Sequence, residues 1–408
     1  MGQRYREGEN MGRQIRAIAI CLSFLMLGPF GTDTFAKGPK NPHGRGPKNP
    51  HARKAKNFHA GAVYVLTNQA SNSVAVFRRN AKGMLTSAGE FPTGGAGNPT
   101  PQPPDPATDP LASQGALLIG RGNQLLFAVN AGSNQISVLK IGKNSLDVVD
   151  VVDSGGIRPI SLTLHDDLLY VLNEGGTPNI SGFEIEEDGT LTPLAGSTQP
   201  LIGGAAADPA QIGFSRDGDL LVVTEKSGNR INTYTIDDDG VPSAPIDNAS
   251  NGMTPFGFAF NNTGALVVSE AFGGAPNQSA VSSYSASDDG VLSVISGSVP
   301  NSQTAACWVV IPTNGKLAFV SNTASGTISS YFINPMNGSL TLINSVAANT
   351  GMGSAPIDMT LSVNSRILFV LLGGTQSVAA FRVGGDGSLT PVNTGGGLPT
   401  GAQGIAAK

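Results

Sequence analysis

One strand pattern recurs along this chain at nearly constant spacing, and it limits the folds that the chain can adopt. The pattern is a short apolar run that mostly ends in Asn or Glu. It occurs at 63–68 (VYVLTN), 125–130 (LLFAVN), 168–173 (LLYVLN), 220–225 (LLVVTE), 265–270 (ALVVSE), 317–322 (LAFVSN) and 367–372 (ILFVLL). Apart from a wider first gap, the copies start roughly 43 to 52 residues apart. Continuous apolar runs of this kind are typical of strands covered on both faces.

The segment 208–240 shows the unit that surrounds each copy. Its sequence predicts an inner strand at 210–214, the apolar second strand at 220–224 and an alternating third strand at 230–236. Asp-Gly pairs stand at 217–218 and 239–240, where a tight hairpin requires a residue that tolerates positive φ. The second pair leads into an outer strand, so each unit is a four-stranded antiparallel sheet.

The repeat predicts an all-β protein, a closed seven-bladed β-propeller, rather than a β-sandwich or a β-helix. The abundance of glycine (54 residues) and the low charged fraction (13%) agree with many turns and short strands. The last segment, 401–407, resembles an inner strand, yet no second strand follows it. We therefore expect it to complete the first blade, whose inner strand is missing, and to close the ring.

The chain before the repeat predicts export and processing. Residues 1–36 have a basic start, an apolar core at 17–30 and a small-x-small site at 34–36, so we interpret them as a signal peptide that begins at Met1 or Met11. We expect a periplasmic or secreted protein without a transmembrane anchor after processing. Residues 37–60 form a basic linker rich in Pro and Gly that could contact an anionic surface. The propeller is expected to span 61–408.

The distribution of charge along the chain limits which partners it can bind. The linker carries Lys and Arg but no acid, and the whole chain has 25 Lys/Arg against 29 Asp/Glu. The propeller is therefore acidic, and we expect no nucleic acid as a partner. Between the first two blades, 91–115 is a proline-rich insertion that is expected to cover one mouth of the propeller.

Several motifs resemble the seven-bladed lactonase family, which includes bacterial 6-phosphogluconolactonase and fungal carboxymuconate-lactonising enzymes. They are LYVLN at 169–173, LFAVN at 126–130, the Asp-Gly-Thr/Ser-Leu turns at 188–191 and 386–389, and the closing strand. Enzymatic members place Gly-Pro-Arg-His before an inner strand and Asn-Glu after the next strand. Here Asn173-Glu174 matches the second element and Arg158 matches the arginine, but Pro159 or Ile160 stands where the histidine would be.

The ends of the second strands are the candidate site, because all these strands run the same way and end on one face. We predict Glu225, Glu174 and Glu270 as catalytic carboxylates. The predicted substrate-binding residues are Arg158, Lys226, Asn130, Asn173, Asn322, Gln211 and Gln403. Two alternatives stay open for the Asn and Glu side chains. They cap loops through side-chain to backbone bonds, or they supply oxygen ligands to a divalent cation such as calcium.

The sequence thus predicts a lactonase-like or cycloisomerase-like protein, most readily a hydrolase, whose substrate is a small lactone or organic acid, such as a sugar-acid lactone or a carboxymuconate-type compound. No cofactor is required for such chemistry. The alternative is a non-catalytic propeller that binds a protein, a glycan or a small ligand on one face. We expect the opposite face, which contains His165, to have no function.

Overall fold

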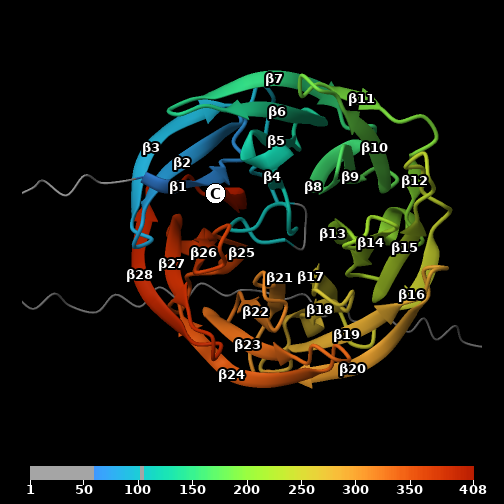
Figure 1. The fold of residues 1–408 in the computed structure, drawn as a ribbon, viewed down its shortest axis with the longest axis vertical. Helices are drawn as coiled ribbons and strands as arrows, with labels where there is room; N and C mark the ends of the chain where they lie inside the picture. The colour runs from blue at the N-terminus through green and yellow to red at the C-terminus, as the bar shows by residue number, and fades with distance from the viewer. Residues whose placement is uncertain (1–58, 102–104) are drawn as a thin grey trace, which may run out of the picture.

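Seven antiparallel sheets follow one another around a ring in the computed structural model, which describes residues 59–101 and 105–408 (Figure 1). The first three sheets have the orders β29-β1-β2-β3, β4-β5-β6-β7 and β8-β9-β10-β11, with β12 pairing β10. Their strands are β1 (His59–Leu66), β2 (Ser73–Asn80), β3 (Leu85–Pro92), β29 (Gln403–Ala407), β4 (Leu117–Gly120), β5 (Leu125–Asn130), β6 (Gln135–Ile141), β7 (Leu146–Asp153), β8 (Ile157–His165), β9 (Leu168–Gly175), β10 (Asn179–Ile185), β11 (Leu191–Pro193) and β12 (Gln199–Pro200).

The other four sheets keep the strands in sequence order, from β13 to β28. Their strands are β13 (Pro209–Phe214), β14 (Leu220–Glu225), β15 (Arg230–Thr235), β16 (Ile246–Ala249), β17 (Pro255–Phe260), β18 (Leu266–Glu270), β19 (Ala280–Ala286), β20 (Leu292–Pro300), β21 (Ala306–Val310), β22 (Leu317–Asn322), β23 (Thr327–Ile333), β24 (Leu340–Asn349), β25 (Pro356–Leu361), β26 (Ile367–Leu372), β27 (Ser377–Val383) and β28 (Leu389–Gly396). The short 3-10 helices are η1 (Arg121–Asn123), η2 (Gly204–Ala206), η3 (Phe272–Gly274) and η4 (Gly373–Thr375).

This arrangement confirms the predicted seven-bladed propeller. The second strands form the core of each blade, and every residue of β5, β14, β22 and β26 is buried. Their apolar runs do not alternate because each second strand is covered by neighbouring sheets on both faces. The predicted signal peptide and nearly all of the predicted linker lie outside the described residues. Within the described part of the chain, no helix is long and apolar enough to cross a membrane.

The C-terminal strand closes the ring, as predicted. β29 pairs antiparallel with β1, with Val63 opposite Ala407 and Tyr64 opposite Ala406. Figure 1 shows the last strand beside the first one, and the chain terminus lies there. Closure pairs both edges of β1, so the first blade is complete with four strands.

The residues that end the second strands join neighbouring blades. Their side chains pack against the glycine-containing connection that arrives from the preceding blade, and a Cβ atom on that glycine would lie within 2.6 Å of the side chain. These pairs are Gly95 with Asn130, Gly156 with Asn173, Gly203 with Glu225 and Gly252 with Glu270. The glycines are therefore required for close approach, and the ring of Asn and Glu side chains ties the blades together.

The insertion between β3 and β4 reaches the centre of the ring (Figure 1). Gln114 clamps the backbone of Val309 in the sixth blade: its Nε2 donates to the carbonyl at 2.9 Å and its Oε1 accepts from the N–H at 3.1 Å. The indole Nε1 of Trp308 donates to the carbonyl of Ser113 at 3.1 Å. The start of the second blade thus crosses the channel to the sixth blade, while the expected cover over one mouth stays a prediction.

Candidate functional site

One pair of positions recurs in every blade at the channel mouth. The first position lies where the chain enters the inner strand, and the second lies where the chain leaves the second strand. In the fourth blade the backbone N–H of Lys226 donates to the carbonyl of Asp208 at 3.0 Å, and the fifth, sixth and seventh blades have the same bond. The starting residue has positive φ, which is costly for residues other than glycine. The values are 57° at Arg158, 48° at Asp208, 57° at Thr254, 57° at Ala305 and 45° at Ala355.

Only the third and fourth blades place opposite charges at this pair of positions. The pairs are Arg158 with Glu174, Asp208 with Lys226, Thr254 with Ala271, Ala305 with Thr323, Ala355 with Gly373, Gly401 with Gln69 and Ala112 with Ala131. The other blades carry small or neutral residues there. A backbone geometry common to the whole ring therefore brings four charged side chains together at one sector of the mouth.

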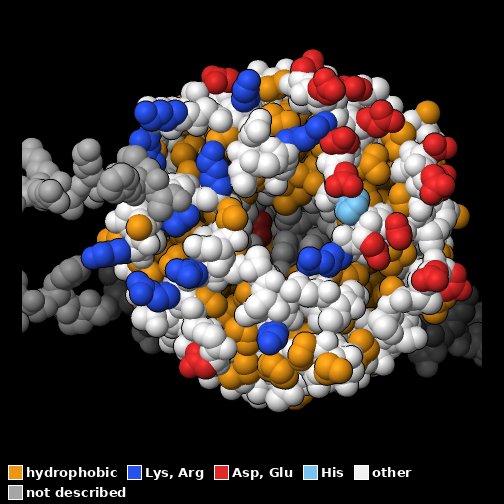
Figure 2. Space-filling view, viewed as in Figure 1, with side chains coloured by type: hydrophobic (Ala, Val, Ile, Leu, Met, Phe, Trp, Pro, Cys, Tyr) orange, Lys and Arg blue, Asp and Glu red, His pale blue; other side chains and the backbone are white. Residues whose placement is uncertain are grey.

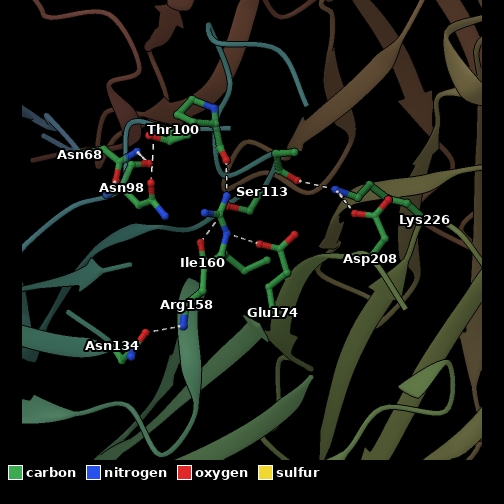
Figure 3. A network of polar contacts seen from close by, with 12 residues as sticks. Asn68, Asn98, Thr100, Ser113, Asn134, Arg158, Ile160, Glu174, Asp208 and Lys226 are labelled. Carbon is green, nitrogen blue, oxygen red and sulfur yellow. Dashed lines mark hydrogen bonds and ion pairs between the residues drawn. The ribbon is translucent and has the colours of Figure 1, made fainter. Parts of the chain in front are cut away.

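Arg158 is the buried centre of this cluster. Its Nε donates to Glu174 Oε2 at 2.6 Å, and the exposed fractions of the two side chains are 5% and 11%. Its Nη2 donates to the carbonyl of Pro110 in the insertion. Its Nη1 is buried and has no partner among the described residues, and Figure 3 shows the guanidinium between Glu174 and the insertion. An unsatisfied buried donor is costly, so Nη1 is a candidate donor to an oxygen of a ligand that reaches it.

Lys226 lies beside Arg158 at the mouth (Figure 3). Its Nζ is 2.9 Å from Asp208 Oδ1, donates to the carbonyl of Ala112 at 3.2 Å and lies 5.2 Å from the centre of the Phe256 ring. Burial acts to lower the pKa of Lys226. The carboxylates around it outweigh burial and raise this pKa above the ordinary value, so the amine keeps its charge.

The insertion adds carboxyl groups to the same mouth. Burial raises the pKa of half-buried Asp105 to about 6, with the charges of Lys226 and Arg158 opposing the rise. Burial also raises the pKa of Asp109 to about 7, and the charge of Asp105 adds to the effect. Asp109 Oδ1 accepts a hydrogen bond from Gln403 Nε2 at 2.9 Å. Groups with pKa values near neutrality can exchange protons with a substrate at physiological pH.

Asp358 is a further buried carboxyl at the start of the seventh blade. Burial raises the pKa of Asp358 to about 7, and hydrogen bonds from the backbone oppose the rise. Its Oδ1 accepts from the N–H of Met359 at 2.8 Å and its Oδ2 from the N–H of Ile405 at 3.2 Å. Both oxygens therefore accept hydrogen bonds, and Oδ2 joins the last blade to the closing strand.

Glu225 and Glu270 point into the blade junctions, where protein groups bind their carboxylates. Glu225 accepts from the N–H of Gly203 at 3.1 Å and from Asn232. Glu270 accepts from the N–H of Gly252 at 2.9 Å, from Ser298 Oγ at 2.7 Å and from Ser282 Oγ. Both residues are fully buried in their blade junctions. This geometry favours a structural role for them, while their predicted catalytic role stays a prediction.

The predicted amide residues also have structural partners. Asn130 accepts from Asn72 and Thr93, Asn173 donates to the carbonyl of Ser154, and Asn322 accepts from Asn301. Gln211 clamps the backbone of Phe258 in the next blade with both amide atoms. Gln403 is the exception, because it reaches the mouth through Asp109.

The side-chain oxygens of Glu225, Glu270, Asn130 and Asn322 accept hydrogen bonds within the protein, and the predicted divalent-cation site stays a prediction. Among residues 59–101 and 105–408, no group of three or more His, Cys, Asp or Glu side chains is arranged to hold a metal ion.

Sequence reasoning found Arg158, Glu174 and Lys226 but missed Asp208, Asp105 and Asp109. A signal for Asp208 existed: it stands directly before Pro209, as Arg158 stands directly before Pro159. No comparable signal existed for the two insertion residues, because their segment has no counterpart in the other blades. Only the folded structure shows that the insertion enters the mouth.

The comparisons with known proteins agree with this architecture. The family model of the seven-bladed β-propeller lactonases matches residues 42–200 and 118–300, and the chain therefore belongs to this family. A 149-residue stretch is 28% identical to a 6-phosphogluconolactonase of Yersinia enterocolitica. That stretch is 36% of this chain and spans 42% of the Yersinia protein.

Solved structures of the same fold include enzymes and candidate enzymes. The periplasmic gluconolactonase of Pseudomonas aeruginosa superposes with a TM-score of 0.65 at 13% identity, over 85% of this chain and 98% of that one. A candidate 6-phosphogluconolactonase of Bacteroides fragilis gives a TM-score of 0.65 at 17% identity, over 87% and 99%. At such identities the likeness concerns the fold, so a function has to be argued from the site.

Proposed function

We propose that this chain is a lactonase that hydrolyses a sugar lactone at the mouth formed by the third and fourth blades and the insertion. The single observation that carries the proposal is the pair of charged couples, Arg158 with Glu174 and Asp208 with Lys226, at ring positions that the other blades fill with small or neutral residues. Family membership and the Yersinia relative support the reaction class.

Hydrolysis requires a base for water and a donor for the oxyanion. Asp105 is the proposed base, because it is half-buried and borders Lys226, whereas Asp109 is buried against Gln403. Asp105 takes a proton from water as the water oxygen bonds to the lactone carbonyl carbon. The unpaired N–H of Arg158 Nη1 stabilises the resulting oxyanion. The carbon–oxygen bond of the ring then breaks, and Asp105 returns the proton to the leaving ring oxygen.

Glu174 acts through Arg158 in this scheme. Its bond to Nε fixes the plane of the guanidinium and turns Nη1 away from Glu174. We therefore assign Glu174 as a positioning residue rather than as the base. The mouth holds more carboxyl groups than cations, which disfavours a phosphorylated substrate and favours a neutral lactone whose hydroxyl groups donate to the carboxylates.

The test is lactone opening measured above the spontaneous rate, with glucono-1,5-lactone and its 6-phosphate as substrates. We expect the neutral lactone to be the better substrate, and Asp105→Asn to lower kcat by roughly 100-fold or more. The activity should rise with pH through about 6, because Asp105 must lose its proton to act as a base. Exposed Asp153 on the same face provides the control variant Asp153→Asn, which should keep full activity. Equal loss in both variants, or no activity in the unmodified chain, would refute the proposal.

One observation favours the alternative of a non-catalytic binding propeller. The insertion already binds both cations, through the carbonyls of Pro110 and Ala112. If these contacts persist with ligand present, the mouth binds a sugar-like ligand without opening a lactone. Saturable ligand binding without turnover would support this reading.

We also propose that the protein acts outside the cytoplasm. Its first 36 residues have the pattern of a signal peptide, and the similar Pseudomonas enzyme is described as periplasmic. Mass spectrometry of the native N-terminus should find cleavage after Ala36, whereas an intact start on cytoplasmic protein would contradict export.

A further inference from the structure

The face opposite the candidate site consists of hairpin turns, because inner strands meet second strands there and third strands meet outer strands. We call it the hairpin face. Its turns in the third, fourth and fifth blades carry a dense group of acids, here called the acidic half. The acidic half consists of exposed Asp166, Asp167, Glu186, Glu187, Asp188, Asp217, Asp219, Asp237, Asp238, Asp239, Asp288 and Asp289. Exposed Arg216 is a basic residue within this region.

The other side of the hairpin face is basic. Its exposed cations, the basic half, come from the seventh, first and second blades and are Lys82, Lys140, Lys143, Arg366 and Arg382. None of these five forms an ion pair within the described part of the chain. Exposed Asp147 and Asp386 are the acids nearby. Figure 2 shows this division plainly, with Asp and Glu gathered over the sheets of β10 and β14 and with Lys and Arg over those of β2 and β27.

A face divided in this way is complementary to itself. A two-fold axis that lies in the plane of the face, between the two halves, places the acidic half of one molecule over the basic half of the other. The first blade, at the centre of the basic half, lies nearly across the ring from the fourth blade, at the centre of the acidic half, so both contacts form at once. Such an isologous contact is the commonest way in which identical chains associate.

We infer that the hairpin face binds the same face of a second copy of this chain. The expectation that this face has no function is thereby replaced by a specific role in self-association. The candidate site lies on the opposite face, so association leaves it open in both copies. The inference is independent of the lactonase proposal, since it rests only on the hairpin charges.

Because the charges are exposed, the association should depend strongly on salt. Single exposed ion pairs contribute little, whereas two extended patches of opposite sign attract over about 10 Å at moderate salt and over longer distances at low salt. We therefore expect dimers at about 20 mM NaCl and monomers at about 500 mM, with an intermediate population between them.

The experiment is sedimentation velocity of the full chain over a concentration series at both salt levels. Two charge-reversal variants are compared: one carries K140E, K143E and R382E, and the other carries D237K, D238K and D239K. Each variant alone should weaken dimerisation at least tenfold, because one half then faces like charge. Mixed together, the two variants should form a heterodimer, since the reversed positions of one variant then face the reversed positions of the other and the unchanged halves pair as in wild type. Asp153→Lys on the opposite face should leave the dimer unchanged.

Three outcomes would overturn the inference. The first is a monomer at low salt throughout the concentration series. The second is a dimer that neither salt nor the reversals change. The third concerns the basic segment 37–58, which has Lys and Arg but no acid. If neutralising that segment abolishes association while both reversal variants stay dimeric, the segment makes the contact and the hairpin face does not.

Discussion

At the scale of single residues, the carboxyl group of Asp109 makes the stability of the fold depend on pH. It is buried, it accepts a hydrogen bond from Gln403, and it forms no ion pair within the described residues. Its pKa of about 7 lies well above the ordinary 3.8. The folded protein therefore binds this proton more tightly than the unfolded chain does, and folding is favoured when the proton is present.

The contribution of Asp109 to the free energy of unfolding should consequently fall as the pH rises from about 4 to about 7. Asp109→Asn keeps the acceptor for Gln403 but cannot ionise, so the variant should lack this part of the slope. The difference in free energy of unfolding between wild type and variant should change by about 1.4 kcal/mol for each unit that separates the folded and unfolded pKa values. Urea titrations at several pH values measure it, and parallel pH curves would contradict the assignment.

At the scale of structural elements, the blade junctions depend on glycine at fixed places. Gly252 donates its N–H to Glu270 Oε1 at 2.9 Å, and a Cβ on Gly252 would lie 2.1 Å from Glu270 Oε2. The side chain of Glu270 is held by two serine hydroxyls as well, so it cannot move away freely. A Cβ atom at this position would therefore overpack the connection between the fourth and fifth blades.

We expect Gly252→Ala to destabilise the fold by about 1–3 kcal/mol, the range found for overpacked sites. The matched control is Gly396→Ala, because a Cβ on Gly396 has no atom within 4 Å. Chemical denaturation of both variants gives the comparison. Equal stability of the two variants would mean that the junction is looser than the described packing.

At the scale of the whole molecule, the ring depends on its last strand. β29 supplies the inner strand of the first blade. The N–H of Ala62 donates to the carbonyl of Lys408 at 3.0 Å, and the N–H of Lys408 donates to the carbonyl of Ala62 at 2.9 Å. Removing 401–408 should expose the edge of β1 and take buried Ile405 and Ala406 out of the core, so the chain should aggregate or melt at a much lower temperature. Lys408→Ala keeps the backbone pairing and should melt normally. A truncated chain that melts like the parent would disprove closure by β29.

The repeat made the whole-molecule architecture predictable, because each copy of the second strand marks one blade and their spacing leaves room for four strands. The site was predictable only in part, because successive residues of a strand point to opposite sides. Glu225 ends its strand facing the blade junction, whereas Lys226, one residue later, reaches the channel mouth. Sequence alone did not tell which of the two faces the ligand.

The position of the insertion could not be predicted from the sequence for a different reason. Its prolines indicated a loop between the first two blades, but no repeat relates it to the other connections. Contacts between residues far apart in the sequence decide its place, such as those of Pro110 with Arg158 and Ala112 with Lys226. The proposed base, Asp105, could not be identified before those contacts were known.

The central claim is that a ligand binds between the charged pairs of the third and fourth blades, and calorimetric binding of a sugar lactam tests it most directly. Such a lactam keeps the ring and carbonyl of the lactone but resists hydrolysis. Arg158→Met should weaken binding at least tenfold, a loss of about 1.4 kcal/mol, because the open N–H at Nη1 is gone. Arg230→Met, which alters a half-exposed arginine paired with Asp247 away from the mouth, should bind like wild type. Unchanged binding by a folded Arg158→Met variant would contradict the account.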